Sequence, residues 1–385
     1  MPALWWTSMI RVGFAALAAA LWAHAAAAQS IETAARHALL VDDATETVLL
    51  DKASDVPMHP SSMSKMMTIY MLFEQLKQGK LKLSDELGVS ERAWRMQGSK
   101  MFVDINTRVR IGDLLRGIIV QSGNDACIVV AEGLAGSEEA FAERMNARAK
   151  QLGLTGSTFR NSTGWPDKQH LMTARDLALL ARHTIHDFPE YYPIYAEKEF
   201  TWHKIKQGNR NPLLYKNVGA DGLKTGHTEE AGYGLTASAM RDGRRLVLVL
   251  NGLTSMNERS REAERLFDWG FREFGNYALF KRDETVDEAQ VWLGEQPTVP
   301  LVATRDALIT LSRKARMGMK AVVSYTGPIK APIAKGTQIA TLVVTAPDSK
   351  TLELPLIAGA DVAQLSAGKR LVAAFKYLVF GKSKT

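Results

Sequence analysis

The sequence predicts an α+β fold, in which an antiparallel sheet with a helical cluster is followed by a small all-β domain and a C-terminal amphipathic helix. Three observations indicate this arrangement. Apolar residues recur at helical spacing through most of residues 55–195. Strand-like apolar runs occupy 38–52 and 224–250. After about Lys281 only short β-type runs remain, until a basic tail begins at Lys369. A chain of 385 residues is long enough for two cores.

The N-terminal segment, residues 1–28, is predicted to be a cleaved signal peptide. Arg11 precedes an apolar run from Val12 to Trp22, and three alanines precede Gln29. An uncleaved N-terminal anchor is the alternative, although the run is short for a bilayer span. Both interpretations imply export. The single cysteine, Cys127, allows no internal disulfide, and its apolar context favours a buried, inert thiol over a nucleophile.

The first predicted domain, residues 29–281, begins with a β-hairpin from Ala38 to Lys52. A helix is predicted from Ser62 to about Gln78, because Pro60 suits the last extended position before a helix, Ser61 is a plausible N-cap and a glycine follows the run. Further helices are predicted over 111–119, 125–134, 138–152 and 174–186.

Strands return in the last part of this domain. Lys224 to Leu250 reads as a strand that leads into a hairpin, and the hairpin is closed by an Asp242-Gly243 turn. An amphipathic helix is predicted from Glu258 to Phe274.

The second domain, residues 282–368, is predicted to be all-β and to act as a spacer or docking module. Its predicted strands are 299–302, 307–311, 321–325, 338–344 and 351–355. Residues 369–385 carry five basic residues and no acid, with apolar residues on one helical face. This pattern is typical of a helix lying in a membrane interface, and packing against the β-domain is the alternative.

The charge balance favours some partners over others. The net charge is +7, and removal of the signal peptide takes away only Arg11 and leaves +6. A modest positive excess favours anionic lipid or cell-wall polymer as a neighbour, and a merely soluble surface explains it equally well. We find no basic stripe interleaved with aromatics, so nucleic acid is not an expected partner.

A Ser-x-x-Lys element, Ser62 to Lys65, opens the first long helix. Spacing of three on a helix brings the amine within reach of the hydroxyl, and a serine needs such a base to act as a nucleophile. The first turn also offers free backbone N–H groups. Alone the element is weak, because Ser366 to Lys369 repeats it.

The order of motifs along the chain is more specific. After Ser62 come Ser122-Gly123-Asn124 and then Lys224-Thr225-Gly226, whereas Ser255-Met256-Asn257 follows the Lys-Thr-Gly element. This order is the signature of penicillin-recognising serine enzymes. The chain resembles the serine-type D-Ala-D-Ala carboxypeptidases, the low-molecular-mass penicillin-binding proteins, over nearly its whole mature length. Supporting segments are 114–117, 119–127, 173–176, 209–211 and 221–228.

The resemblance implies a serine β-lactamase/DD-peptidase-like first domain. It implies a reaction in which Ser62 attacks the carbonyl between the two D-alanines of a peptidoglycan stem peptide, with Lys65 as base and Ser122 as proton relay. A lysine with a pKa of about 10.4 is charged at neutral pH, so burial or a nearby cation, for which Lys224 is the candidate, must lower it.

The resemblance also implies the binding residues. Asn124 would hold the substrate amide, and Lys224 and Thr225 would bind the terminal carboxylate with help from Arg210. The backbone N–H groups of Ser62 and His227 would form the oxyanion hole. Gly226 would let the ligand backbone approach the strand closely.

Two other functions remain open. A β-lactamase shares all three motifs, but class A enzymes use a Glu-x-x-Leu-Asn element, and the only Leu-Asn here, Leu250-Asn251, is preceded by Val247. A non-catalytic peptidoglycan-binding protein would not need the intact reactive residues. The pair His183 and His186 lacks a carboxylate at a known zinc spacing, so no metal and no cofactor are expected.

The expected location is the periplasm, peripheral on the outer face of the cytoplasmic membrane. The expected partners are the peptidoglycan stem peptide, β-lactam antibiotics and the membrane surface.

Overall fold

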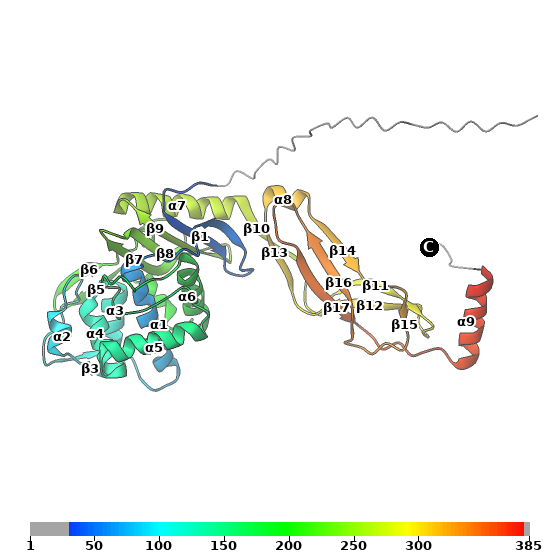
Figure 1. Cartoon of the computed structure of the whole chain (residues 1–385), viewed down its shortest axis with the longest axis horizontal. Coiled ribbons are helices and arrows are strands. Elements are labelled where there is room, and N and C mark those ends of the chain that lie inside the picture. Colours follow the sequence, from blue (N-terminus) through cyan, green and yellow to red (C-terminus); the bar gives the residue numbers. More distant parts are fainter. Residues whose placement is uncertain (1–30, 381–385) are drawn as a thin grey trace, which may run out of the picture. The chain divides into compact units, whose positions relative to one another are not determined.

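A computed structural model describes residues 31–380 of the chain. The predicted signal peptide, 1–28, and the last five residues of the predicted anchor lie outside the described residues. The first domain is built on a five-stranded antiparallel sheet with the strand order β2-β1-β9-β8-β7 (Figure 1). The strands are β1 (His37–Asp42), β2 (Val48–Lys52), β7 (Ala220–Thr228), β8 (Gly232–Arg241) and β9 (Arg244–Leu253). Strand β7 forms one edge of this sheet.

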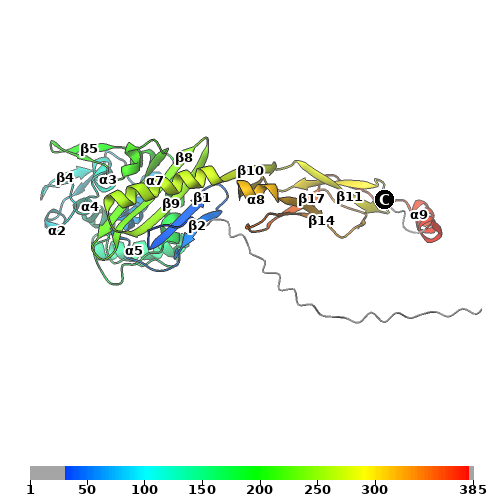
Figure 2. The same cartoon turned by 90° about the horizontal axis from the view of Figure 1, so that it is seen from above.

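Helices cover both faces of the sheet, with α7 on one face and the remaining helices of the domain on the other (Figures 1 and 2). The long helices are α1 (Lys65–Lys77), α3 (Ile111–Ile119), α4 (Asn124–Ala135), α5 (Glu138–Gln151), α6 (Ala174–Asp187) and α7 (Met256–Glu273). Helix α4 is buried from its first residue to Ala131, so it forms the centre of the helical cluster. The predicted hairpin and helices are therefore confirmed, with ends that differ by at most a few residues.

The start of the Ser62 helix differs from the prediction. Residues Ser61–Ser64 form a 3₁₀ turn, η1, and the α-helix begins at Lys65. Pro60 is not extended but has helical backbone angles, and Ser61 has a φ of +51° and makes no capping bond. The cause is packing: a Cβ on Gly226 of β7 would lie 2.7 Å from the Pro60 carbonyl oxygen, so the sheet presses directly on this turn.

Several short elements were not predicted from the sequence, because each is only a few residues long. They are α2 (Glu91–Arg95), β3 (Glu86–Gly88), β4 (Arg108–Arg110), β5 (Glu199–Trp202), β6 (Ile205–Gly208), η2 (Tyr192–Ala196) and η3 (Pro212–Tyr215). Strands β5 and β6 form a hairpin of their own.

The second domain is rich in strands, as predicted, with one short helix, α8 (Arg313–Met317). A six-stranded sheet has the order β14-β16-β17-β12-β11-β15, and β10 pairs with β13. The strands are β10 (Phe274–Phe280), β11 (Thr285–Trp292), β12 (Thr298–Ala303), β13 (Ala307–Ser312), β14 (Lys320–Ser324), β15 (Ile329–Lys330), β16 (Gln338–Thr345) and β17 (Leu352–Ala358). Leu301, Leu342 and Leu356 lie in its separate core. Strand β10 belongs to this assembly although it precedes residue 282.

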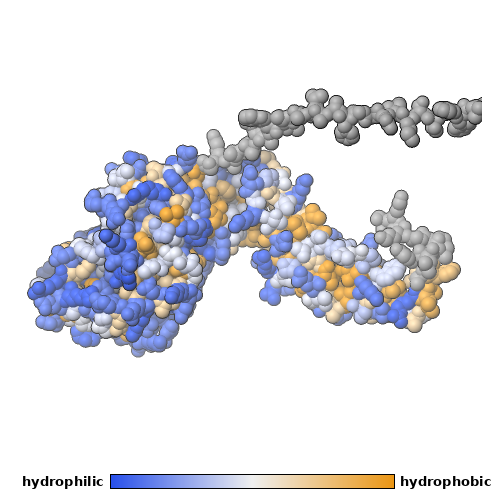
Figure 3. All heavy atoms as spheres, in the orientation of Figure 1, coloured by the Kyte–Doolittle hydropathy of each residue, from blue (hydrophilic) through white to orange (hydrophobic). Residues whose placement is uncertain are grey.

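The chain continues into helix α9 (Ala367–Phe380). Leu371, Val372 and Phe375 are strongly exposed on it, at 74%, 57% and 66%. Within residues 31–380, no helix combines the length and apolarity needed to cross a membrane. The surface of the helical cluster that faces the viewer in Figure 3 is mainly hydrophilic.

Candidate active site

The serine and lysine of the first motif are in direct contact. Lys65 Nζ lies 2.8 Å from Ser62 Oγ and donates to the carbonyl oxygen of Thr163 at 2.5 Å. Lys65 is fully buried, whereas Ser62 is partly exposed. The predicted contact between the amine and the hydroxyl is therefore confirmed, and it leaves the hydroxyl accessible to a ligand.

The pKa of Lys65 is lowered to about 8, chiefly because burial penalises the charged amine. The positive charge of Arg210 lowers it further. The sequence predicts Lys224 as the cation that lowers the pKa of Lys65. The pKa of Lys224 is itself lowered well below its ordinary value, first by burial and then by the charge of Lys65.

The second and third motifs meet in the same place. Lys224 Nζ donates to Ser122 Oγ at 2.9 Å, and both side chains are buried. Ser122 lies in the break between α3 and α4, as predicted, with a φ of +59°. This left-handed backbone conformation is uncommon for serine and occurs where surrounding structure enforces it.

Asn124 is the first residue of α4, and Gly123 is the N-cap. The Asn124 Nδ2 donates to the carbonyl oxygen of Gln97 at 2.8 Å, which orients the side-chain amide and assigns its oxygen the acceptor role. Arg210 donates to Ser99 Oγ at 2.5 Å. Both predicted binding residues are thus tied to the loop that carries residues 97–99.

Strand β7 supplies the remaining predicted residues. Thr225 and Gly226 are buried against η1, while His227 is exposed and stacks on Tyr233 with ring centroids 3.9 Å apart. Because β7 is an edge strand, one side of its backbone has no neighbouring strand in the sheet. An extended peptide can pair with such an edge.

A loop that the sequence reading missed completes the site. Asn161 Oδ1 accepts hydrogen bonds from the backbone N–H groups of Thr163, Gly164 and Trp165 at 3.1, 2.8 and 3.0 Å. This turn aims the Thr163 carbonyl at Lys65. An Asn-Ser-Thr-Gly sequence is a turn signal, and it was available in the chain.

Two buried carboxylates hold these loops in position. Asp125 accepts from the backbone N–H groups of Met101 and Phe102 at 2.9 and 2.8 Å. Glu138 accepts from the N–H and hydroxyl of Ser162 at 2.9 and 2.8 Å. Both carboxylates are therefore engaged by donors.

The two histidines considered for metal binding lie beside carboxylates, and the cysteine considered as a nucleophile is buried. His183 lies 3.2 Å from Asp187, and His186 lies 2.9 Å from Asp43. Cys127 is buried, and burial raises the pKa of its thiol to about 12. Across residues 31–380 no group of three or more His, Cys, Asp or Glu side chains could hold a metal ion.

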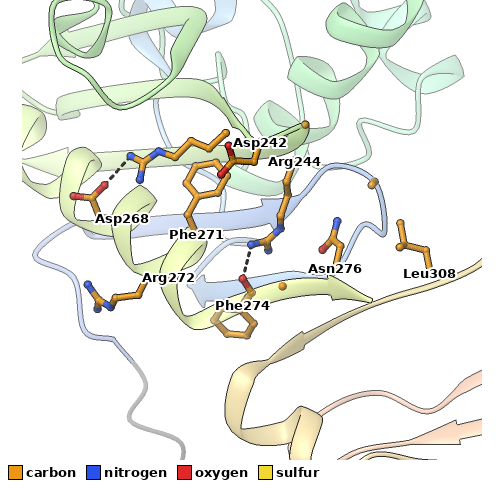
Figure 4. Close-up of a pocket in the computed structure, with 12 residues that line it drawn as sticks. Asp242, Arg244, Asp268, Phe271, Arg272, Phe274, Asn276 and Leu308 are labelled. Atoms are coloured by element: carbon orange, nitrogen blue, oxygen red, sulfur yellow. Dashed lines mark hydrogen bonds and ion pairs between the residues drawn. The ribbon is translucent and has the colours of Figure 1, made fainter. Parts of the chain in front are cut away.

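A cavity lies away from these residues, between the ends of β8, α7 and β10 (Figure 4). It encloses about 1240 Å³, counting the part open to solvent. Several of its charged side chains have partners: Arg241 bonds Asp268 at 2.7 Å, and Arg244 donates to the Phe274 carbonyl oxygen at 2.7 Å. None of the predicted site residues lines it.

A serine and a depressed-pKa lysine in contact, a second serine-lysine pair and an open strand edge define a penicillin-recognising serine enzyme. Comparisons with known proteins agree with this class. The family model described as D-alanyl-D-alanine carboxypeptidase matches residues 23–254, and the model for the penicillin-binding protein 5 C-terminal domain matches 274–364. The chain belongs to the D-alanyl-D-alanine carboxypeptidase family.

Individual relatives support this membership. The chain is 41% identical to D-alanyl-D-alanine carboxypeptidase DacC of Escherichia coli (strain K12) over 352 residues, covering 88% of each chain. Penicillin-binding protein 5 from Haemophilus influenzae has a similar structure, with a TM-score of 0.77, 37% identity, and coverage of 87% of this chain and 99% of that one. Penicillin-binding protein D2 from Listeria monocytogenes, in its ampicillin-bound form, matches with a TM-score of 0.58, 28% identity, and coverage of 63% and 98%.

Proposed function

We propose that this chain is a serine-type D-alanyl-D-alanine carboxypeptidase that removes the terminal D-alanine from peptidoglycan stem pentapeptides through an acyl-enzyme on Ser62. The observation that carries the proposal is the contact between Ser62 Oγ and the buried amine of Lys65. With a pKa of about 8, about a tenth of the Lys65 amine is neutral at pH 7. That fraction can accept the proton of the attacking hydroxyl.

Acylation would proceed as follows. Ser62 Oγ forms a bond to the carbonyl carbon between the two D-alanines while its proton passes to Lys65. The carbon–nitrogen bond then breaks, and Ser122 relays the proton held by Lys65 to the departing D-alanine nitrogen. Lys224, which donates to Ser122 Oγ at 2.9 Å, orients this relay.

Strand β7 would position the substrate. An extended peptide beside its open edge places the terminal carboxylate near Lys224 and Thr225, and the reacting carbonyl near the N–H of His227. Together with the N–H of Ser62, this donor would stabilise the oxyanion. Recognition of a free terminal carboxylate makes the enzyme a carboxypeptidase.

Water would then release the acyl group. The carboxylates whose charges act on Lys65, Asp125 and Glu138, are both engaged by other donors. They are poorly placed to activate water as the glutamate of a class A β-lactamase does. Lys65 would therefore serve both half-reactions, and a penicilloyl-enzyme, whose leaving group stays attached, would persist.

The product of a pentapeptide reaction tests the proposal. Incubation with a muropeptide ending in D-Ala-D-Ala should release one D-alanine per stem and leave a tetrapeptide, as measured by mass spectrometry. An unchanged pentapeptide beside a normal penicillin adduct would indicate a binding protein instead.

We also propose that the protein is exported and that α9 attaches it to the outer face of the cytoplasmic membrane. Basic residues Lys369 and Arg370 adjoin the exposed apolar residues Leu371, Val372 and Phe375. Such a helix suits an interface with anionic lipid.

Sedimentation with vesicles containing anionic phospholipid tests the attachment. The double variant Leu371→Glu/Phe375→Glu should remain in the supernatant. Met317→Glu is the matched control, because Met317 on α8 is exposed to 84%. Equal sedimentation of all three proteins would contradict the attachment through α9.

A further inference from the structure

The loop whose carbonyl oxygen receives the Lys65 N–H is anchored to helix α5. Ser162 is fully buried, and both its backbone N–H and its hydroxyl donate to Glu138 Oε1, at 2.9 and 2.8 Å. Glu138 is the first residue of α5, directly after the N-cap Ser137, and is 7% exposed. A carboxylate is favoured at a helix N-terminus, where the helix dipole is positive. A charged side chain on a long helix therefore holds the loop.

The same stretch of the loop is also bonded to helix α1. Thr68 Oγ1 donates to the carbonyl oxygen of Ser162 at 2.7 Å, and Lys65 Nζ donates to that of Thr163 at 2.5 Å. Lys65 and Thr68 are three residues apart on one helix, so they present neighbouring donors to two consecutive carbonyls. Glu138 and Thr68 thus fix Ser162 from two helices. Because Thr163 is the next residue, a displacement of Ser162 would carry its carbonyl away from the amine.

A surface arginine balances the charge of the buried carboxylate. Arg92 Nη2 lies 2.6 Å from Glu138 Oε2, and Arg92 Nη1 lies 2.9 Å from Glu139 Oε1. The side chain of Arg92 is 47% exposed and that of Glu139 is 69% exposed. One oxygen of Glu138 accepts from the loop and the other from Arg92, as expected of an ionised carboxylate. A buried charge needs such pairing to be tolerated.

Glu138 also acts on Lys65 through its charge. Burial lowers the pKa of Lys65 to about 8, and the negative charge of Glu138 acts in the opposite direction. The other titratable groups that act on Lys65, or on which Lys65 acts, are Asp125 and Cys127 on α4, Lys224 on β7, Arg210 and His170. A change in the charge of Glu138, or in its pairing with Arg92, should therefore shift the pH at which Lys65 becomes neutral.

We infer that Glu138 is a positioning residue for Lys65, on which it acts through the loop at Ser162. Arg92 balances the negative charge that this anchor brings into the protein interior. The role differs from that of a catalytic glutamate, because both carboxylate oxygens are occupied by the loop and by the arginine. The inference rests on the proposed mechanism, in which Lys65 takes the proton of Ser62. It gives an arginine outside the three motifs an influence on that step.

Substitutions at Glu138 separate its two effects. Glu138→Ala removes the anchor and should lower the rate constant for penicillin acylation at pH 7 by about tenfold or more, because a ~1 Å displacement of a reacting group can cost on the order of a hundredfold. Glu138→Gln keeps an acceptor oxygen for Ser162 but removes the charge. It should acylate faster than Glu138→Ala at every pH, and the midpoint of its pH–rate profile should lie below that of the native enzyme.

Arg92→Gln should shift the midpoint the other way, to higher pH, because the charge of Glu138 is then left without its counter-ion. Glu139→Gln is the matched control: Glu139 also pairs with Arg92, but the loop is bonded to Glu138. The control should keep the native rate and midpoint. Stopped-flow acylation at a series of pH values measures all four variants, and thermal unfolding followed by circular dichroism verifies that each is folded.

Opposite shifts in Glu138→Gln and Arg92→Gln are a result that a merely structural role would not produce. Native rates and midpoints in both Glu138 variants would overturn the inference, and so would midpoints that move in the same direction in Glu138→Gln and Arg92→Gln. If Glu138→Ala does not fold, this pair of midpoints decides the inference by itself. A native enzyme that forms no penicilloyl adduct would instead contradict the proposed acyl-enzyme mechanism, and the inference with it.

Discussion

The carbonyl oxygen of Thr163 lies 2.5 Å from the amine nitrogen of Lys65, which also contacts Ser62 Oγ at 2.8 Å. A neutral amine has two N–H donors and one lone pair. If one N–H is held by Thr163, the lone pair can face the Ser62 hydroxyl. The backbone of the loop thus suits Lys65 to its proposed role as a base, which depends on geometry as well as on the lowered pKa.

Replacement of the serine in each Ser-x-x-Lys element should show which of the two elements reacts with penicillin. Ser62→Ala should abolish covalent labelling by a fluorescent penicillin, because Ser62 contacts Lys65. Ser366→Ala should label normally, since Ser366 is an exposed residue just before α9. Gel fluorescence measures both variants, and labelling that survives in Ser62→Ala would refute the assignment.

The rate of acylation should rise with pH through about 8. Lys65 must be neutral to accept the proton, and its pKa is about 8 in the folded protein. Below that pH the rate constant for penicillin acylation should fall about tenfold per pH unit. Stopped-flow measurement of the acylation rate constant between pH 5 and 9.5 gives this part of the pH–rate profile.

Lys65→Arg provides the matching control, because a guanidinium stays charged over this range. It should acylate slowly at every pH. A pH-independent native rate, or a normal limb in Lys65→Arg, would argue that another group is the base.

The loop that holds Lys65 should not tolerate a side chain at Gly164. This residue has a φ of +74°, and a Cβ would lie 2.0 Å from the Ser61 carbonyl oxygen. Gly164→Ala should therefore displace Thr163 and lower acylation at least tenfold. Gly136→Ala is the control, because Gly136 has a φ of +83° but nothing lies within 4 Å of its Cβ position. Equal effects of the two changes would show that φ alone matters.

Lys224→Ala should weaken substrates with a free terminal carboxylate more than their C-terminal amides. Loss of a charge-assisted hydrogen bond costs ~1.5–3 kcal/mol, or about ten- to a hundredfold in kcat/KM. Steady-state assays on the paired peptides measure the difference. Equal losses on both would mean that Lys224 acts through Ser122, to which it donates, and not on the carboxylate.

Helices and site residues that depend on a pattern of side chains could be predicted from the sequence. Helical periodicity predicts α3, and the order of the motifs predicts that Ser62, Ser122 and Lys224 lie in one site. Ser61 was misread as a cap because its conformation is set by contacts with β7 from far along the chain. Thr163 contacts Lys65 through its backbone carbonyl, which every residue has, so the Asn-Ser-Thr-Gly pattern could indicate the turn but not the contact that the carbonyl makes.

The most direct test of the account compares the fate of two acyl-enzymes on Ser62. Acylation with penicillin followed by a chase measures the lifetime of the penicilloyl-enzyme, and a D-amino-acid oxidase assay measures D-alanine released from a peptide ending in D-Ala-D-Ala. The account predicts an adduct that lasts for minutes or longer beside steady release of D-alanine. Rapid penicillin turnover without D-alanine release would contradict it and identify a β-lactamase.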